Sequence, residues 1–106
     1  MPMTIGNGRK TVTTGGTAVQ LSTTSTPFTK LTITAETDNT NPVVVGGSTV
    51  VAALATRQGT PLAQGDSYTI EVKGQEAGNL TAIYIDAVTD TEGVTYSYIN
   101  ETWRNA

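Results

Sequence analysis

The sequence predicts an all-β protein, an antiparallel β-sandwich or jelly roll of about seven or eight short strands. Threonine supplies about a fifth of the 106 residues, and its branched Cβ suits a pleated strand better than a helix. Segments that alternate apolar and polar residues recur along the chain, separated by turns rich in Gly, Asn, Asp and Pro. This spacing favours antiparallel sheets over a βαβ arrangement.

The amino-terminal part predicts an arm followed by a hairpin. Residues 1–9 show little periodicity, so we expect an arm that is ordered only where it touches something. Lys10–Thr14 and Thr17–Leu21 are the first expected strands. Gly15 and Gly16 lie between them and supply the φ freedom that a tight hairpin turn needs.

The clearest alternation in the chain follows a polar loop. Leu31, Ile33 and Ala35 lie on one face of an expected strand, and this apolar face should belong to the core. The turn-forming residues of Asp38–Pro42 end this strand. Val43–Val45 is too short for a helix and is interpreted as the next strand, closed by a pair of glycines.

Three further strands are expected in the second half of the chain. Ser67–Lys73 alternates clearly, Leu80–Val88 is expected to direct Ile83, Ile85 and Ala87 inward, and Val94–Ile99 is rich in Tyr and β-branched residues. Asp90–Gly93 is expected to join the last two strands as a hairpin turn. Val50–Arg57 is interpreted as a loop or an irregular edge.

The composition is that of one small domain, which we place at residues 10–99, between the arm and a tail at residues 100–106. No Cys is present, so neither a disulfide framework nor a thiolate metal site is expected. A net charge of -3 argues against a nucleic-acid partner. The amino terminus has no apolar run of signal-peptide length, and no stretch approaches the roughly 20 apolar residues of a membrane span. We therefore expect synthesis in the cytoplasm and no membrane partner.

The residues that most catalytic sites need are missing. Without His or Cys, the usual general base, the thiol nucleophile and the commonest metal ligand are absent, so no enzyme is expected. The carboxylates lie in turns and on polar strand positions, and we expect them to be solvated. Asp38, Asp86, Asp90 and Glu92 could offer oxygens to Ca²⁺, but their spacing fails the EF-hand pattern, and we expect no metal. The GGST run at residues 46–49 is interpreted as a turn, and no cofactor is expected.

The aromatic residues allow two interpretations. Tyr68, Tyr84, Tyr96 and Tyr98 could serve as sugar platforms, but no cluster of Trp or Asn accompanies them. Packing in the core or at a subunit interface is the interpretation we favour. Trp103, the only Trp, follows the last expected strand and either folds back onto the domain or anchors a partner.

The order of strands and turns resembles a small β-module common in virion proteins of tailed bacteriophages. The resemblance rests on TGGTAVQLS, FTKLTITAE, VVVGGSTV and GTPLAQGDSYTIEV. In that module a PLAxGxS-like turn leads into a strand. The positions that match this turn here are Pro61, Leu62, Ala63, Gly65 and Ser67.

The resemblance covers roughly residues 13–99 and implies a structural protein of the virion. It includes head decoration (cement) proteins and segments of head-fibre and tail proteins, and it carries no catalytic motif. A short chain with two tails favours a capsid decoration protein, a homotrimer that binds the major capsid protein on the outer surface of the mature head. A tail or head-fibre module that recognises host surface glycan is the alternative, and an unrelated sugar-binding sandwich is a third possibility.

The residues expected at the interfaces lie near the two ends of the chain. We expect the amino-terminal arm, with Arg9 and Lys10, to contact the shell; residues 1–12 lie outside the module pattern. Tyr96, Tyr98 and Trp103 are expected to anchor the trimer or the shell.

Overall fold

The chain forms two antiparallel four-stranded sheets, and the all-β prediction is confirmed. The computed structural model describes residues 3–72 and 77–101. Its principal extents are 45, 24 and 20 Å. The front sheet contains, in spatial order, β1 (Met3–Val12), β10 (Glu92–Glu101), β4 (Lys30–Ala35) and β7 (Ser67–Glu71). The back sheet contains β2 (Val19–Gln20), β9 (Tyr84–Ala87), β5 (Val43–Gly46) and β6 (Thr60–Leu62).

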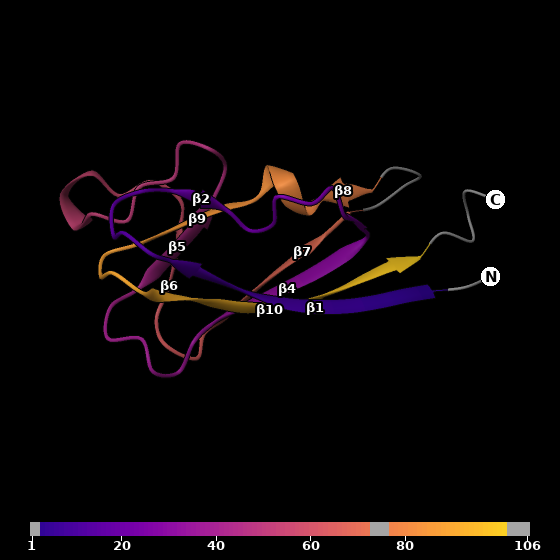
Figure 1. Ribbon diagram of the computed structural model, residues 1–106, viewed down its shortest axis with the longest axis horizontal. Helices are drawn as coiled ribbons and strands as arrows, with labels where there is room; N and C mark the ends of the chain where they lie inside the picture. Colours follow the sequence, from indigo (N-terminus) through magenta and orange to yellow (C-terminus); the bar gives the residue numbers. More distant parts are fainter. Residues whose placement is uncertain (1–2, 73–76, 102–106) are drawn as a thin grey trace.

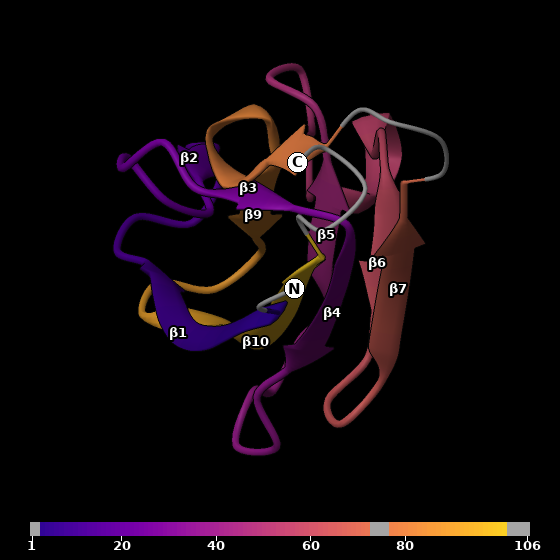
Figure 2. The same ribbon diagram turned by 90° about the vertical axis from the view of Figure 1, so that its right-hand side faces the viewer.

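Smaller elements complete the described part of the chain. A two-stranded ribbon joins β3 (Pro27–Phe28) to β8 (Gly78–Asn79), and two short 3₁₀ turns occupy η1 (Leu54–Thr56) and η2 (Leu80–Ala82). Within the described residues, no helix is long and apolar enough to cross a bilayer. Figure 2 shows the two sheets from the end of the molecule.

The core lies between the two sheets, as the alternating pattern predicts. Leu31, Ile33 and Ala35 of β4 are fully buried, which confirms the expected inward face. They meet side chains of the back sheet in one cluster, and burial of this apolar surface is the main stabilising contribution to folding. The cluster consists of Val12, Leu21, Phe28, Leu31, Ile33, Ala35, Val43, Val45, Leu62, Leu80, Ile85, Ala87 and Val94.

The run of three valines in β5 reflects burial on both faces of the back sheet. Val43 and Val45 point into the core, while Val44 packs on the opposite face against Val50 and Ala52. The loop after β5 therefore covers the outer face of the back sheet at this position. A strand covered on both sides reads as a continuous apolar run, as this one does.

Both expected hairpins are wrong, because each turn carries the chain from one sheet to the other. The turn at Gly15 and Gly16 leads from β1 in the front sheet to β2 in the back sheet, and Gly16 has a φ of +90°. Asp90–Gly93 leads from β9 in the back sheet to β10 in the front sheet, with Thr91 at a φ of +67°. Such turns need residues with a positive φ, as hairpin turns do.

The first and last strands are long and pair with each other over their whole length. The register runs from Met3 opposite Glu101 to Val12 opposite Glu92. The residues expected to form an arm lie in β1 from Met3 onward, and β10 extends beyond the expected Val94–Ile99. In Figure 1 the paired strands β1 and β10 run side by side along one side of the molecule.

A buried carboxylate connects the back sheet with two loops. Asp86 of β9 is 1% exposed, so the expectation of a solvated side chain is wrong here. Its Oδ1 accepts hydrogen bonds from the backbone N–H groups of Gly16 (3.1 Å) and Ala87 (2.9 Å). Its Oδ2 accepts one from Ala52 (2.9 Å), in the loop that covers β5. The carboxylate is buried because backbone donors replace its water.

Replacing Asp86 by Ala should lower the free energy of unfolding by about 2–4 kcal/mol, because buried N–H groups lose their acceptor. The matched control is Asp66→Ala, at an exposed turn carboxylate that accepts one hydrogen bond from Ala63. It should cost less than about 1 kcal/mol. Urea unfolding of the two variants measures both values, and equal losses would contradict this role of Asp86.

Candidate binding surface on the outer face of the front sheet

The outer face of the front sheet is covered with hydroxyl groups. Thr34 and Ser67 form a cross-strand hydrogen bond of 2.8 Å between their hydroxyls, and Thr32 and Thr69 form a longer one of 3.4 Å. These pairs tie β4 to β7 on the solvent side, where such pairs stabilise a sheet. The hydroxyl-bearing residues of this face are Thr32, Thr34, Ser67, Thr69, Thr95 and Ser97.

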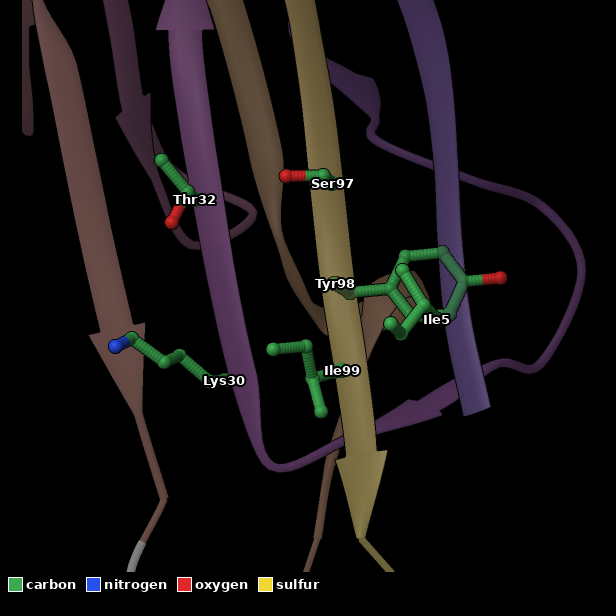
Figure 3. Close-up of a pocket in the computed structure, with 6 residues that line it drawn as sticks. All are labelled: Ile5, Lys30, Thr32, Ser97, Tyr98 and Ile99. Atoms are coloured by element: carbon green, nitrogen blue, oxygen red, sulfur yellow. The ribbon is translucent and has the colours of Figure 1, made fainter. Parts of the chain in front are cut away.

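An apolar hollow interrupts this polar face near the end of the sheet that holds Met3 and Glu101. Ile5 and Ile99 are register partners on β1 and β10, and Ile5 is 67% exposed. Lys30 of β4 completes the hollow, and Figure 3 shows these side chains on three neighbouring strands. The hollow has a volume of about 250 Å³ and is lined by Ile5, Lys30, Thr32, Ser97, Tyr98 and Ile99. It combines apolar area with one ammonium group.

A second, charged hollow lies nearer the middle of β1. The Arg9 guanidinium forms a two-point ion pair with Glu36, through Nε and Nη2. The hydrogen bond to Glu36 and its charge raise the pKa of Arg9 above its ordinary value. The Arg9 side chain remains 63% exposed. The hollow has a volume of about 420 Å³ and is lined by Arg9, Thr34, Ala35, Glu36, Thr37, Asp38 and Thr95.

Glu92 holds the loop that follows Glu36. Its carboxylate accepts hydrogen bonds from the backbone N–H and hydroxyl of Thr40 (2.5 and 2.8 Å) and from the backbone N–H of Asn41 (3.2 Å). Burial alone raises the pKa of Glu92, but these hydrogen bonds outweigh it and bring the pKa below its ordinary value. At 8% exposure Glu92 is buried, which corrects the expectation of a solvated carboxylate a second time.

Asn39 fixes the same loop from inside. Its side-chain amide donates to the Gly93 carbonyl (2.9 Å) and accepts from the Gly93 N–H (3.3 Å), and Asn39 itself is buried. These two bonds imitate a pair in a β-ladder. The loop of the charged hollow is thus tied to the start of β10 at neighbouring residues, Glu92 and Gly93.

Tyr96 and Tyr98 cover two glycines of the neighbouring strand. They lie opposite Gly8 and Gly6, and a Cβ on either glycine would come within 2.5 Å of the facing Tyr side chain. The two rings stack with centroids 6.4 Å apart and pack against the core cluster. Burial, with a smaller effect of Tyr98, raises the pKa of Tyr96. An aromatic ring over a strand glycine restores the packing that the missing side chain would provide.

The residues predicted for the interfaces occupy different surroundings. Arg9 lines the charged hollow, and Lys10 is half-buried on the other face of β1. Tyr96 and Tyr98 pack within the chain, although Tyr98 also lines the apolar hollow. Trp103 lies outside the described residues.

The apolar hollow itself was missed by the sequence reasoning. Ile5 was assigned to an arm, so its position opposite Ile99 on a neighbouring strand was not expected. A signal was present in the alternation of Ile5 with Gly6, Asn7 and Gly8, but two glycines hide a strand pattern.

Comparisons with family models, curated proteins and solved structures find no match to this chain. Within residues 3–72 and 77–101, no group of three or more acidic side chains is placed to hold a metal ion. The outer face of the front sheet is a hydroxyl-covered surface with one apolar hollow and one charged hollow.

Replacing Gly6 by Ala should displace the Tyr98 ring, because the new Cβ would lie 2.3 Å from the ring carbon Cζ. We expect the free energy of unfolding to fall by about 1–3 kcal/mol, as for other overpacked positions. Gly47→Ala is the control, since no atom beyond its chain neighbours lies within 4 Å of a Cβ there. Denaturant unfolding measures the difference, and near-UV circular dichroism reports the displaced ring. Equal stability of the two variants would contradict the packing described.

Acidification should destabilise the protein partly through Glu92. A carboxyl whose pKa is lowered by folding stabilises the folded state above its unfolded pKa, and this contribution is lost as the pH falls through its folded pKa. Glu92→Gln should therefore lower the free energy of unfolding by about 1–2 kcal/mol at pH 7 and flatten its decrease below the ordinary pKa of 4.5. Urea unfolding between pH 3 and pH 7 tests this. Glu71→Gln, at an exposed position, should keep the wild-type profile. A Glu92→Gln profile parallel to that of the wild type would refute the prediction.

Proposed function

We propose that this protein is a bacteriophage capsid decoration (cement) protein, which binds the outer surface of the mature head and stabilises it by bridging capsomers. The observation that carries the proposal is the apolar hollow around Ile5 and Ile99 on an otherwise polar sheet face. An exposed Ile5 beside a half-buried Ile99, bordered by hydroxyls, is typical of a protein-binding surface. Its partner would be the major capsid protein, and its location the virion.

The hydrogen bonds and the ion pair of the carboxylates support a binding role rather than a catalytic one. Asp86 and Glu92 accept backbone hydrogen bonds that hold loops, and Glu36 pairs with Arg9. Such groups serve the architecture. The front sheet then presents its outer face on four strands, each paired with its neighbours.

The contact we propose combines two kinds of interaction. Ile5 and Ile99 would bury apolar area against the shell, and the nearby Lys30 ammonium would pair with a carboxylate of the major capsid protein. Arg9, still largely exposed beside Glu36, would add a charged contact along the same face. Symmetric copies of the protein repeat these contacts, so a weak single contact is multiplied by avidity.

Stabilisation of the shell would follow from linkage. A protein that binds the expanded shell and not its precursor adds its binding free energy to the stability of the expanded form. If one copy bridges two adjacent capsomers, this binding free energy must be overcome before the capsomers can separate. A homotrimer over a local three-fold position would contact three capsomers at once.

Ile5→Asp should weaken binding to empty expanded capsids at least tenfold, about 1.4 kcal/mol, because it places a carboxylate in the apolar contact. The matched control is Leu54→Asp, at an apolar residue 81% exposed on η1, away from the front sheet. It should bind as the wild type does. Co-sedimentation with capsids over a range of protein concentrations gives both affinities.

Two outcomes would overturn the proposal. One is equal binding of the Ile5→Asp and Leu54→Asp variants, which would show that the apolar hollow does not contact the capsid. The other is a wild-type protein that ignores expanded capsids and binds host polysaccharide instead, which would favour the glycan-recognising alternative.

A further inference from the structure

Within the described part of the chain, the front sheet has two edge strands, β1 and β7. In the order β1, β10, β4, β7, the outer strands each pair with a neighbour on one side only. An edge strand presents backbone N–H and C=O groups that attract another strand. The β1 edge is ten residues long and contains no Pro.

The hydrogen bonds of β10 show which groups of β1 point outward. The backbone groups of Gly93 and Ile99 in β10 form their hydrogen bonds on the side of β4. Gly93 bonds to Glu36 and Asn39, and the carbonyl of Ile99 accepts from the N–H of Thr29. Because backbone groups alternate along an antiparallel strand, the even-numbered residues of β10 face β1. Their partners are the even-numbered residues of β1. The residues of β1 that direct their backbone groups away from the sheet are therefore Ile5, Asn7, Arg9 and Thr11.

The same reasoning applies to β7. The N–H of Val72 donates to Thr29, and the carbonyl of Asp66 accepts from Ala35, so the even-numbered residues face β4. Ser67, Thr69 and Glu71 then direct their backbone groups outward. On both edges these outward-directed residues also place their side chains on the outer face of the front sheet.

The two edges carry opposite charges. Residues 1–12 contain Arg9 and Lys10 and no acidic residue, whereas residues 66–72 contain Asp66 and Glu71 and no basic residue. Pairing β1 with the β1 strand of another copy would bring like charges together. Pairing β1 with β7 of another copy brings opposite charges together, with Arg9 and Glu71 on the same face.

We infer that β1 of one copy adds to β7 of the next copy, antiparallel and head to tail, so that the front sheet continues across the subunit boundary. The directions agree, because the strands of the front sheet alternate and the next β1 would continue that alternation. A head-to-tail contact of this kind closes into a ring when its rotation allows. The inference names the contact within the homotrimer of the proposed function and rests on that proposal only for the existence of an oligomer.

Proline substitutions on the two edges test the contact. Asn7→Pro and Thr69→Pro each remove one outward-directed N–H and leave the pairing inside the sheet intact, which edge strands tolerate. Ser48→Pro is the control, at an exposed position of the turn closed by the Val50 N–H and the Gly47 carbonyl. Light scattering after size exclusion should give the mass of three 11.0 kDa chains for the wild type and the control. Each edge variant should give the mass of one chain.

A mixture of the two edge variants gives the sharpest result. Asn7→Pro retains an intact β7 edge and Thr69→Pro an intact β1 edge, so mixing them should produce a dimer of one copy of each. A monomeric mixture overturns the inference, as does a wild-type monomer or an oligomer that persists in either variant. Loss of assembly in Asn7→Pro alone would instead indicate β1 paired with β1.

A second measurement covers the case in which a variant does not fold, as judged by circular dichroism. In the wild type, exchange of the Asn7, Arg9 and Thr69 amide hydrogens should slow at least tenfold as the protein concentration is raised. Exchange independent of concentration overturns the inference. Capsid co-sedimentation, measured separately, distinguishes failure of this contact from failure of the proposed function.

Discussion

The buried carboxylate of Asp86 is the interaction on which the rest of the back sheet depends. It accepts hydrogen bonds from Gly16, where the chain crosses between the sheets, and from Ala52, in the loop that covers β5. The small apolar cluster of Val44, Val50 and Ala52 exists only because that loop stays in place. One side chain therefore couples the connection between the two layers to the packing on the far side of the back sheet. In a domain of this size, where apolar burial leaves little surplus, such a coupling has a large effect.

Buried polar side chains also hold a loop at the front sheet. Glu92 and Asn39 bind the loop between β4 and β5 to the beginning of β10, again through backbone donors and acceptors. The buried side chains of Asn39, Asp86 and Glu92 thus hold loops, whereas the Thr and Ser side chains of β4, β7 and β10 lie on the outer face of the front sheet. This division explains how a protein with one modest core supports a sheet face with two hollows. The loop that borders the charged hollow is held by side-chain hydrogen bonds to the start of β10.

Much of the fold could be predicted from local patterns, and the remainder depended on pairing over long distances in the sequence. The alternation around Leu31, Ile33 and Ala35 correctly placed the core face, because period and burial agree there. The glycines at 15 and 16 indicated a turn, but a turn between sheets needs the same backbone freedom as a hairpin. Ile85 and Ala87 point into the core, so Asp86 between them points to the outer face of the back sheet, as the alternation predicts. It is buried there by the loop that contains Ala52. At the candidate surface, Arg9 lines the charged hollow, and its expected contact with a shell stays a prediction. Ile5 was hidden because its partner Ile99 lies far away in the sequence.

The pairing of β1 with β10 has a consequence for how the molecule is made. Met3 lies opposite Glu101, so β1 has no partner in its sheet until β10 has left the ribosome. Contacts of such wide sequence separation form slowly, because much of the chain must be ordered before they close. The β1 edge therefore takes shape only after β10 has been synthesised. A nascent chain whose synthesis stalls before Glu92 has no β10 to hold that edge in position.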